Sequence, residues 1–220
     1  MKPPARVGIF GGTFNPVHLG HLRSAEEIAE GLQLDRVLFV PSSEPPHKTT
    51  ANLVPAKQRL AMVRLAVAGN TRFQASALEV DRGGRSYSVD TLRSLRRRLG
   101  GEASLFFFLG IDAFREIESW KEYREIFSLA HVVVTSRPPE RVERRMRLLP
   151  VAVRSQFCYR PTRGWIHRSG HEILFRSVTP LAISASDIRL RLGRGQSIRY
   201  LVPAAVELYI QRHHLYRPEV

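Results

Sequence analysis

Two histidines three residues apart follow a glycine-rich turn near the start of the chain. The segment reads Gly11-Gly12-Thr13-Phe14-Asn15-Pro16-Val17-His18-Leu19-Gly20-His21. On a helix, His18 and His21 share a face, and the first turn of a helix offers free N–H groups and a positive dipole end to an anion. Gly20 leaves room beside the two rings because it has no Cβ. This spacing indicates a phosphate site at which two imidazoles donate hydrogen bonds as negative charge builds up.

Other interpretations of the histidine pair compete with phosphate binding. A metal half-site would need more ligands, but no cysteine or carboxylate stands nearby at ligand spacing, so no protein-held metal is expected. A pair of surface histidines stays open, although the flanking glycines argue against it. Gly8, Gly11 and Gly12 do not have the dinucleotide-binding spacing, and no glycine-lysine-serine follows a strand as in a P-loop. Phosphate binding by another motif is the better hypothesis.

A second segment with phosphate chemistry lies near the C-terminal end. It reads Ile183-Ser184-Ala185-Ser186-Asp187-Ile188-Arg189. Ser184 or Ser186 can cap the helix that follows, and Arg189 lies within about its first turn. Hydroxyls, free amides and one guanidinium that converge on a point can hold a polyphosphate. Taken alone, the segment is better explained as an ordinary capped helix with a surface arginine; beside the histidine segment, phosphate binding is the better explanation.

Further polar and aromatic residues follow the predicted strands. Trp120, in a polar setting, can stack on a flat heteroaromatic ring, although it can also be a core residue. Residues 41–48 form a proline-rich loop that presents a lysine, and residues 85–92 lead into a helix whose N–H groups can meet an anion; a surface turn and a helix cap explain them as well. The candidate binding residues of this group are Lys48, Tyr87, Ser88, Gly110, Asp112, Trp120, Lys121 and Arg137.

These residues need elements that bring them together, and strand-like and helix-like segments alternate along the chain. The strand-like segments are 5–10, 36–40, 73–80, 105–109, 131–135 and 172–178, and the helix-like ones are 18–32, 55–68, 88–99, 141–149 and much of 184–215. The alternation predicts an α/β fold with a doubly wound, mostly parallel sheet. The apolar run 105–109 suits a strand buried on both faces. Ligands of such sheets bind beyond the carboxyl ends of the strands, where the candidate residues stand.

The two phosphate segments resemble the signatures of the HxGH nucleotidyltransferases. Residues 11–21 match the first signature, and residues 183–189 are similar to the Ile-Ser-Ser-Thr-x-x-Arg element, with Ala185 and Ser186 as departures. Asn15 stands where that family usually has aspartate. The resemblance implies a Rossmann-like nucleotidyltransferase fold, with His18 and His21 as catalytic residues. The ATP-binding residues that it implies are Gly11, Gly12, Thr13, Phe14, His18, His21, Gly110, Asp112, Ser184, Ser186 and Arg189.

Within that superfamily, residues 6 to about 137 and 180 to 213 look like bacterial nicotinate mononucleotide adenylyltransferases. The resemblance implies transfer of AMP from ATP to nicotinate mononucleotide, which gives nicotinate adenine dinucleotide and pyrophosphate in NAD biosynthesis. Trp120 would stack on the nicotinate ring, and backbone amides near Ser88 and Lys121 would receive its carboxylate. The acceptor-binding residues that it implies are Lys48, Tyr87, Ser88, Asp112, Trp120, Lys121 and Arg137. Mg²⁺ is expected on the ATP phosphates, held by substrate and water.

The composition leaves other classes to weigh. The net charge is +14, and residues 137–176 hold ten arginines, no lysine and three glutamates, which gives +7. A nucleic-acid-binding protein would explain this charge and the arginines at 93 and 96–98, but a solvated helix face explains them better, so no nucleic-acid partner is expected. A catalytically impaired family member and the neighbouring pantetheine-phosphate adenylyltransferases stay as alternatives. Preference between nicotinate and nicotinamide mononucleotide stays open, as does a homo-oligomer.

Chain length and the distribution of apolar residues limit how many domains and which membrane segments the chain can have. The 220 residues are enough for one sizeable core, and no domain boundary is evident, so we predict one nucleotidyltransferase domain over 1–220 with a C-terminal helical part at about 184–215. No stretch approaches the roughly 20 apolar residues of a membrane helix, and no signal-peptide pattern precedes the first strand. Cys158 is the single cysteine, so no internal disulfide can form. We therefore expect a cytoplasmic protein without a membrane partner.

Overall fold

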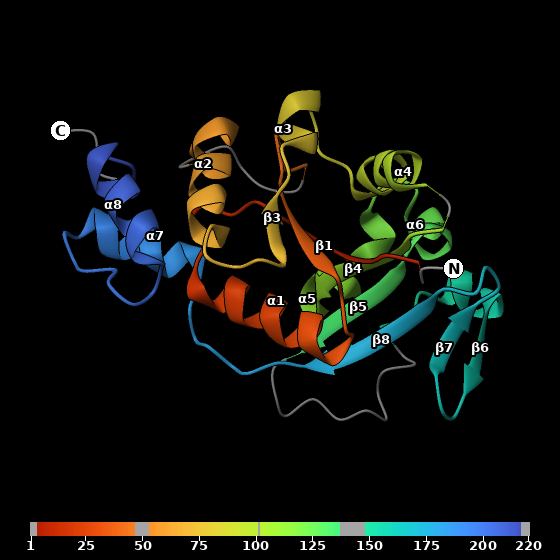
Figure 1. The fold of residues 1–220 in the computed structure, drawn as a ribbon. Helices are drawn as coiled ribbons and strands as arrows, with labels where there is room; N and C mark the ends of the chain where they lie inside the picture. The colour runs from red at the N-terminus through yellow and green to blue at the C-terminus, as the bar shows by residue number, and fades with distance from the viewer. Residues whose placement is uncertain (1–3, 47–52, 101, 137–147, 217–220) are drawn as a thin grey trace.

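The computed structural model describes residues 4–46, 53–100, 102–136 and 148–216. Its strands form one eight-stranded sheet in the order β3-β2-β1-β4-β5-β8-β7-β6 (Figure 1). The strands are β1 (Arg6–Gly12), β2 (Arg36–Pro41), β3 (Phe73–Ala75), β4 (Ser104–Gly110), β5 (His131–Ser136), β6 (Phe157–Arg160), β7 (Gly164–His167) and β8 (Glu172–Ser177). Neighbours pair in parallel from β3 to β8, and only β7 and β6 add antiparallel pairs at one edge. The prediction of an α/β fold with a mostly parallel sheet is confirmed.

Helices cover both faces of this sheet. They are α1 (Leu19–Gly31), α2 (Ala56–Val67), α3 (Leu78–Arg82), α4 (Ser88–Leu99), α5 (Ile111–Arg115), α6 (Tyr123–Leu129), α7 (Ala185–Gly193) and α8 (Ala204–Arg212), with 3₁₀ turns η1 (Ile117–Ser119) and η3 (Val151–Gln156). In Figure 1, α7 and α8 lie at one end of the molecule and the β6–β7 hairpin lies at the other. Side chains of α1, α2, α7 and α8 share one hydrophobic cluster, and those of α3 to α6 share another.

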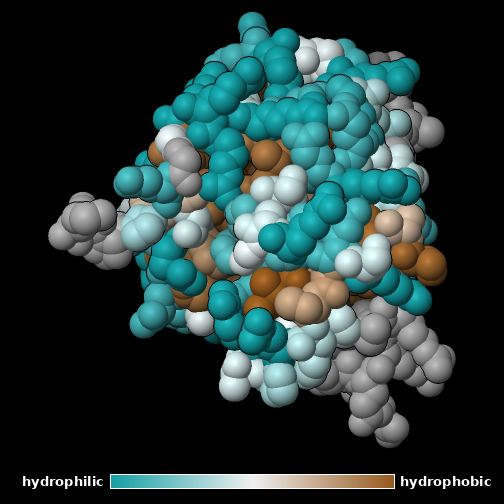
Figure 2. All heavy atoms as spheres, turned by 90° about the vertical axis from the view of Figure 1, so that its right-hand side faces the viewer, coloured by the Kyte–Doolittle hydropathy of each residue, from teal (hydrophilic) through white to brown (hydrophobic). Residues whose placement is uncertain are grey.

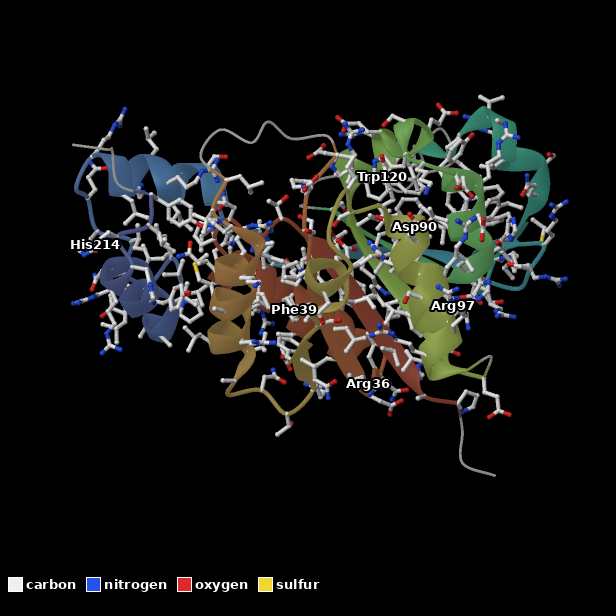
Figure 3. All side chains as sticks on the ribbon, turned by 90° about the horizontal axis from the view of Figure 1, so that it is seen from above. Arg36, Phe39, Asp90, Arg97, Trp120 and His214 are labelled. Atoms are coloured by element: carbon white, nitrogen blue, oxygen red, sulfur yellow. The ribbon has the colours of Figure 1, made fainter. Side chains whose placement is uncertain are left out.

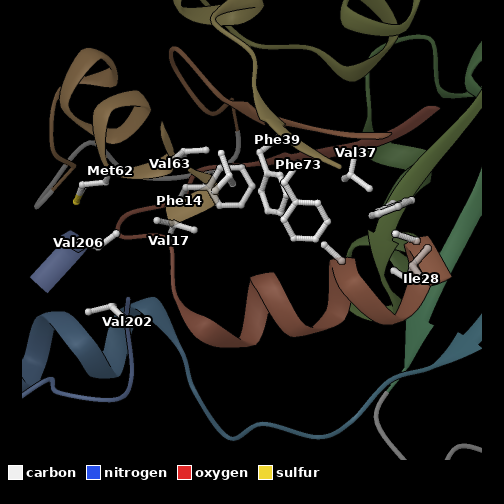
Figure 4. Packing of buried hydrophobic residues seen from close by; sticks show 14 of the residues in the cluster. Phe14, Val17, Ile28, Val37, Phe39, Met62, Val63, Phe73, Val202 and Val206 are labelled. Atoms are coloured by element: carbon white, nitrogen blue, oxygen red, sulfur yellow. The ribbon is translucent and has the colours of Figure 1, made fainter. Parts of the chain in front are cut away.

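Strand β4 shows why the predicted apolar run had to be continuous. Side chains of a strand alternate between the two faces of the sheet. Phe106 and Phe108 therefore join the cluster under α1 and α2, while Leu105, Phe107 and Leu109 join the cluster under α4 to α6. Figure 4 shows the first cluster, in which Phe39 and Phe73 pack near α1 and Val206 comes in from the C-terminal end. Apolar side chains are needed on both faces because helices cover both.

Two sequence-based element predictions need correction. Residues 73–80 were expected to form a strand, but β3 ends at Ala75 and α3 begins at Leu78. The N–H of Ser76 still donates to Phe39 O at 2.8 Å, and beyond it the chain turns into α3, with the Ser76 hydroxyl accepting the N–H of Leu78 at 3.4 Å. The antiparallel hairpin β6–β7 was not predicted. The helix expected at 141–149 lies mainly outside the described residues.

Much of the positive charge on α4 supports packing. Arg93 pairs with Glu122 and Glu125 of the α6 segment, and Arg96 donates to the carbonyls of Leu129 and Ala103 at 2.7 and 2.6 Å.

Figure 2 shows the end of the molecule that carries the β6–β7 hairpin as a mainly hydrophilic face with smaller hydrophobic areas. No helix among the described residues is long and apolar enough to cross a membrane. The contacts of Arg93 and Arg96 with the protein itself weaken the case for an arginine face of α4 that binds nucleic acid.

Gly8→Ala is expected to lower the free energy of unfolding by about 1–3 kcal/mol, because the added methyl group overpacks the sheet under α1. A Cβ at this position would lie 2.8 Å from Phe108 Cζ and 3.1 Å from Val37 Cγ2. Urea unfolding measures the change. Gly31→Ala is the matched control, since a Cβ there meets nothing within 4 Å and alanine favours the helix. A similar loss in both variants would contradict this account of the packing.

Candidate active site

Two cavities meet at the edge of the sheet where the parallel strands end. The histidine cavity, about 690 Å³, is lined by His18, His21 and the start of α7. The tryptophan cavity, about 320 Å³, is lined by Trp120, Pro45, Pro46 and the start of α4. Both are lined by Phe10 of β1 and by Phe108, Leu109 and Gly110 of β4. Ligands in the two cavities would therefore approach each other over the ends of the two central strands.

The two imidazoles are fixed against each other at the start of α1. Their ring centroids lie 3.6 Å apart, nearly parallel, and the backbone N–H of His18 donates to Nδ1 of His21 at 3.2 Å. A neutral imidazole nitrogen that accepts a hydrogen bond carries no proton, so the proton of His21 is on Nε2. A Cβ on Gly20 would lie 3.1 Å from Nδ1 of His18. The glycine therefore provides the space beside the ring that the sequence predicted.

The second signature reaches the same cavity from the other end of the chain. Ser184 caps α7 by accepting the N–H of Asp187 at 3.1 Å, and Ser184 and Ser186 line the histidine cavity. Arg189 donates to the carbonyl oxygen of Asn15 at 2.8 Å and to Oγ of Ser186 at 3.3 Å. The structure thus brings together two segments that are about 170 residues apart in the chain, as the phosphate hypothesis requires.

Asn15, at the position where the resembled family usually has aspartate, has a structural role. Its side chain is buried, and its Oδ1 accepts the N–H of Val54 at 3.2 Å and the hydroxyl of Tyr216 at 2.8 Å. One carbonyl oxygen is enough for these two bonds. Burial raises the pKa of Tyr216, so its hydroxyl stays protonated and able to donate. Val54 and Tyr216 were not predicted, because a backbone amide and a C-terminal tyrosine carry no sequence signal for this contact.

Arg59 is a further residue that sequence reasoning missed. It is fully buried on α2 and donates to the carbonyls of Val54 at 2.8 Å, Thr13 at 2.7 Å and Ser43 at 2.8 Å. Burial lowers the pKa of its guanidinium, which nevertheless stays charged at neutral pH. The signal that could have revealed it is its spacing of four residues from Val63, a member of the apolar stripe. An arginine in register with a buried stripe must find acceptors inside the protein.

The tryptophan cavity joins an aromatic wall to the start of α4. The Trp120 ring packs edge-on to Phe107, with centroids 6.4 Å apart, and Ser88 is the first residue of α4, so its N–H belongs to the turn without intrahelical partners. Lys121 Nζ lies 3.0 Å from Asp90 Oδ2 and 4.9 Å from the centre of the Tyr87 ring. Figure 3 shows Trp120 and Asp90 close together, with Arg97 toward the other end of α4.

A buried polar network lies beside the tryptophan cavity. Glu79 lines the cavity and accepts the hydroxyl of Thr91. Burial raises the pKa of Glu79, and hydrogen bonds from Thr91 and Ser86 oppose that rise. Ser86 also accepts the N–H of Ser43 at 2.8 Å. The network ties the loop after β2 to α3 and to the segment that leads into α4.

The other predicted residues divide between the cavities. Gly11, Gly12 and Thr13 line the tryptophan cavity, whereas Asp112 lines the histidine cavity, with a 90% exposed side chain that pairs with Arg115 at 3.2 Å. The Phe14 side chain is buried in the hydrophobic core and contacts the His21 ring edge-on at 5.1 Å. Lys48 and Arg137 lie outside the described residues.

Comparisons with known proteins cover most of the chain. Residues 9–191 match the model of the cytidylyltransferase-like family. A Geobacter sulfurreducens protein named "Probable nicotinate-nucleotide adenylyltransferase" is 47% identical over 212 residues, which cover 96% of this chain and 98% of that one. A protein of the same name from Citrifermentans bemidjiense is 48% identical with the same coverage.

Solved structures share the fold. The Plasmodium falciparum nicotinic acid mononucleotide adenylyltransferase complexed with NaAD superposes with a TM-score of 0.71 at 17% identity, over 96% of this chain and 97% of the other. A putative nicotinate-nucleotide adenylyltransferase from Vibrio parahaemolyticus gives a TM-score of 0.65 at 19% identity, over 98% and 97% of the two chains. At these identities the likeness concerns the fold.

Tyr216→Phe is expected to lower the free energy of unfolding by about 1 kcal/mol, because Asn15 loses one of its hydrogen-bond donors. Chemical denaturation measures the change. Tyr200→Phe serves as the control, since that side chain is 82% exposed and its loss of a hydroxyl should leave stability unchanged. In an Asn15→Leu background, Tyr216→Phe should have a much smaller effect, because the acceptor is already gone. An undiminished effect there would place the partner of Tyr216 elsewhere.

Proposed function

The chain belongs to the cytidylyltransferase-like family and, within it, to the nicotinate-nucleotide adenylyltransferases, and we propose that its two cavities divide the substrates of that reaction between them. The enzyme is a nucleotidyltransferase of NAD biosynthesis that transfers AMP from ATP to nicotinate mononucleotide. ATP occupies the histidine cavity and the mononucleotide occupies the tryptophan cavity. The observation that carries this assignment is that both signature segments line one cavity, which meets the second cavity at Gly110.

The reaction is an attack by a phosphate oxygen of the mononucleotide on the α-phosphorus of ATP. The new O–P bond forms the dinucleotide as the bond to the bridging oxygen of pyrophosphate breaks. Such a transfer depends on alignment and charge stabilisation rather than on a protein nucleophile. The shared wall of Phe10, Phe108 and Gly110 supports an alignment of the two phosphates across the ends of β1 and β4.

The histidine pair is proposed to stabilise the charge that develops during this transfer. His21 Nε2–H donates to a phosphate oxygen, and its orientation is fixed by the bond from the His18 amide to Nδ1. Ser184, Ser186 and the first amides of α7 complete the binding of the ATP phosphates. Arg189 supports this cavity indirectly: it donates to the carbonyl oxygen of Asn15 and to Oγ of Ser186, which lines the cavity, while its own side chain lines a neighbouring cavity beside Val54.

Mg²⁺ is proposed to travel with ATP. When bound, the ion neutralises charge on the departing pyrophosphate. Among the described residues, no group of three or more His, Cys, Asp or Glu side chains is placed to hold a metal ion, and the carboxylate that lines the histidine cavity is that of Asp112. These donors fit an ion that phosphate oxygens and water hold. Asp112 is the carboxylate that the protein offers in this cavity.

The acceptor is proposed to bind as a flat ring with two anionic ends. The nicotinate ring stacks on Trp120, and its carboxylate receives the N–H of Ser88 at the positive end of α4. Lys121 lies beside this position, although its ammonium already pairs with Asp90.

Residues 1–220 are proposed to act as one nucleotidyltransferase domain, in which α7 and α8 close the ATP end.

His21→Ala should lower turnover by at least about 100-fold, the scale of losing one donor to a transition-state oxyanion. Pyrophosphate release from ATP and nicotinate mononucleotide measures it, with circular dichroism to verify folding. His213→Ala, an exposed histidine at the end of α8, is the control and should retain wild-type turnover. Near-normal turnover in the His21 variant would remove this histidine from the mechanism.

The acceptor assignment is tested with a panel of phosphorylated compounds. The wild-type enzyme should release pyrophosphate with nicotinate mononucleotide faster than with nicotinamide mononucleotide, because only the former offers a carboxylate to the start of α4. Phosphopantetheine should give no release, and removal of Mg²⁺ with a chelator should abolish the reaction. Tight RNA or DNA binding with a steep salt dependence, together with no release from any acceptor, would instead favour a nucleic-acid-binding protein.

A further inference from the structure

Ser42 is a buried polar residue whose hydroxyl is unpaired in the structure. It follows β2 directly, and its side chain is 8% exposed. Its Oγ is buried and has no hydrogen-bond partner in the structure. Buried hydroxyls are nearly always paired, so an unpaired one needs an explanation. Ser42 also lines the tryptophan cavity, and a ligand in that cavity is a partner that the free protein lacks.

The backbone fixes Ser42 at the junction of the glycine turn and the tryptophan cavity. Its N–H donates to Gly12 O at 2.9 Å, one residue beyond the point where Pro41 pairs with Gly12. The next residue, Ser43, is held by Ser86 and Arg59, at 2.8 Å each. The backbone at Ser42 is therefore fixed, and its hydroxyl can change direction only by rotation about the Cα–Cβ bond.

The position of Ser42 identifies which part of a mononucleotide it would meet. Gly12 belongs to the turn that leads to the histidines, so the junction lies on the side of the cavity that faces the ATP phosphates. Trp120, Tyr87 and Lys121 form the ring-binding wall and come from the α4–α6 side of the sheet. The group that must reach the ATP side for reaction is the acceptor phosphate. A hydroxyl donates most strongly to an anionic oxygen.

We propose that the Ser42 hydroxyl is a binding group for the acceptor phosphate, which it orients for attack by donating a hydrogen bond to a non-attacking oxygen. This rests on the proposed function, because it requires a phosphorylated acceptor in the tryptophan cavity. The bond leaves the attacking oxygen unprotonated and free. The unpaired hydroxyl of the free protein thereby becomes paired only when the acceptor binds.

The test is Ser42→Ala, which has opposite expected effects on stability and on catalysis. Because it removes a buried hydroxyl without a partner, the melting temperature of the free protein should be unchanged or higher. The kcat/KM for nicotinate mononucleotide should fall by about 10- to 100-fold, the scale of one hydrogen bond to a charged group. The KM for ATP should stay within about twofold, since that substrate binds in the other cavity. Ser128→Ala is the control, because Ser128 is exposed and its hydroxyl donates only to Glu125 O of its own helix, α6.

A second measurement separates the phosphate from the rest of the acceptor. Nicotinate riboside lacks the phosphate, so its affinity, measured by calorimetry, should be the same for wild type and Ser42→Ala, whereas the affinity for the mononucleotide should differ. A weaker affinity for both ligands would assign Ser42 to the ribose or ring and overturn the proposal. A lower melting temperature with an unchanged kcat/KM would also overturn it, by showing a structural hydroxyl. Failure of the proposed function is distinct: wild type itself would then use no mononucleotide.

Discussion

The buried guanidinium of Arg59 is the contact on which the site depends. A charge inside a protein must be met by acceptors, and Arg59 has three backbone carbonyls, from Thr13, Ser43 and Val54. These belong to the signature turn, to the loop after β2 and to the segment before α2. One side chain thereby holds the three segments that border the two cavities. Its hydrogen-bond acceptors are neutral carbonyl oxygens, and the carboxylate that acts on its charge from nearby is that of the buried Glu79.

The signature turn is assembled from parts of the chain that are far apart. The side chain of Asn15 accepts hydrogen bonds from Val54 and Tyr216, and its backbone carbonyl accepts one from Arg189. The segment before α2, the C-terminal end and α7 therefore meet at one residue. The sheet explains why they converge there. The strand order reverses direction between β1 and β4, and a crevice opens at such a switch point beyond the carboxyl ends of the strands. The Rossmann-like order therefore decides where the site is, and the buried hydrogen bonds decide its shape.

The sequence predicted elements and motifs better than contacts. The continuous apolar run 105–109 and the glycine turn before His18 carry strong local patterns, and the structure has β4 and α1 at those positions. The contacts of Arg59 and Asn15 use backbone groups, which every residue has, so no residue type marks their partners. The sequence also does not indicate that the signature segment borders two cavities. Its start, at Gly12, lines the tryptophan cavity, and its end, at His18 and His21, lines the histidine cavity. The prediction of a strand over 73–80 was wrong beyond residue 75, because the chain turns there and α3 begins at Leu78.

In the proposed site, the donors available to anionic substrates are mainly neutral, although the protein is strongly basic. Among the described residues, cations that line the two cavities are already paired, Lys121 with Asp90 and Arg115 with Asp112. The donors that remain for phosphate are an imidazole N–H, hydroxyls and helix amides. Interactions that bind substrate, transition state and product equally tightly do not speed the chemical step. Fixed neutral dipoles gain most where charge develops, so this choice of donors favours the transition state and allows pyrophosphate to leave.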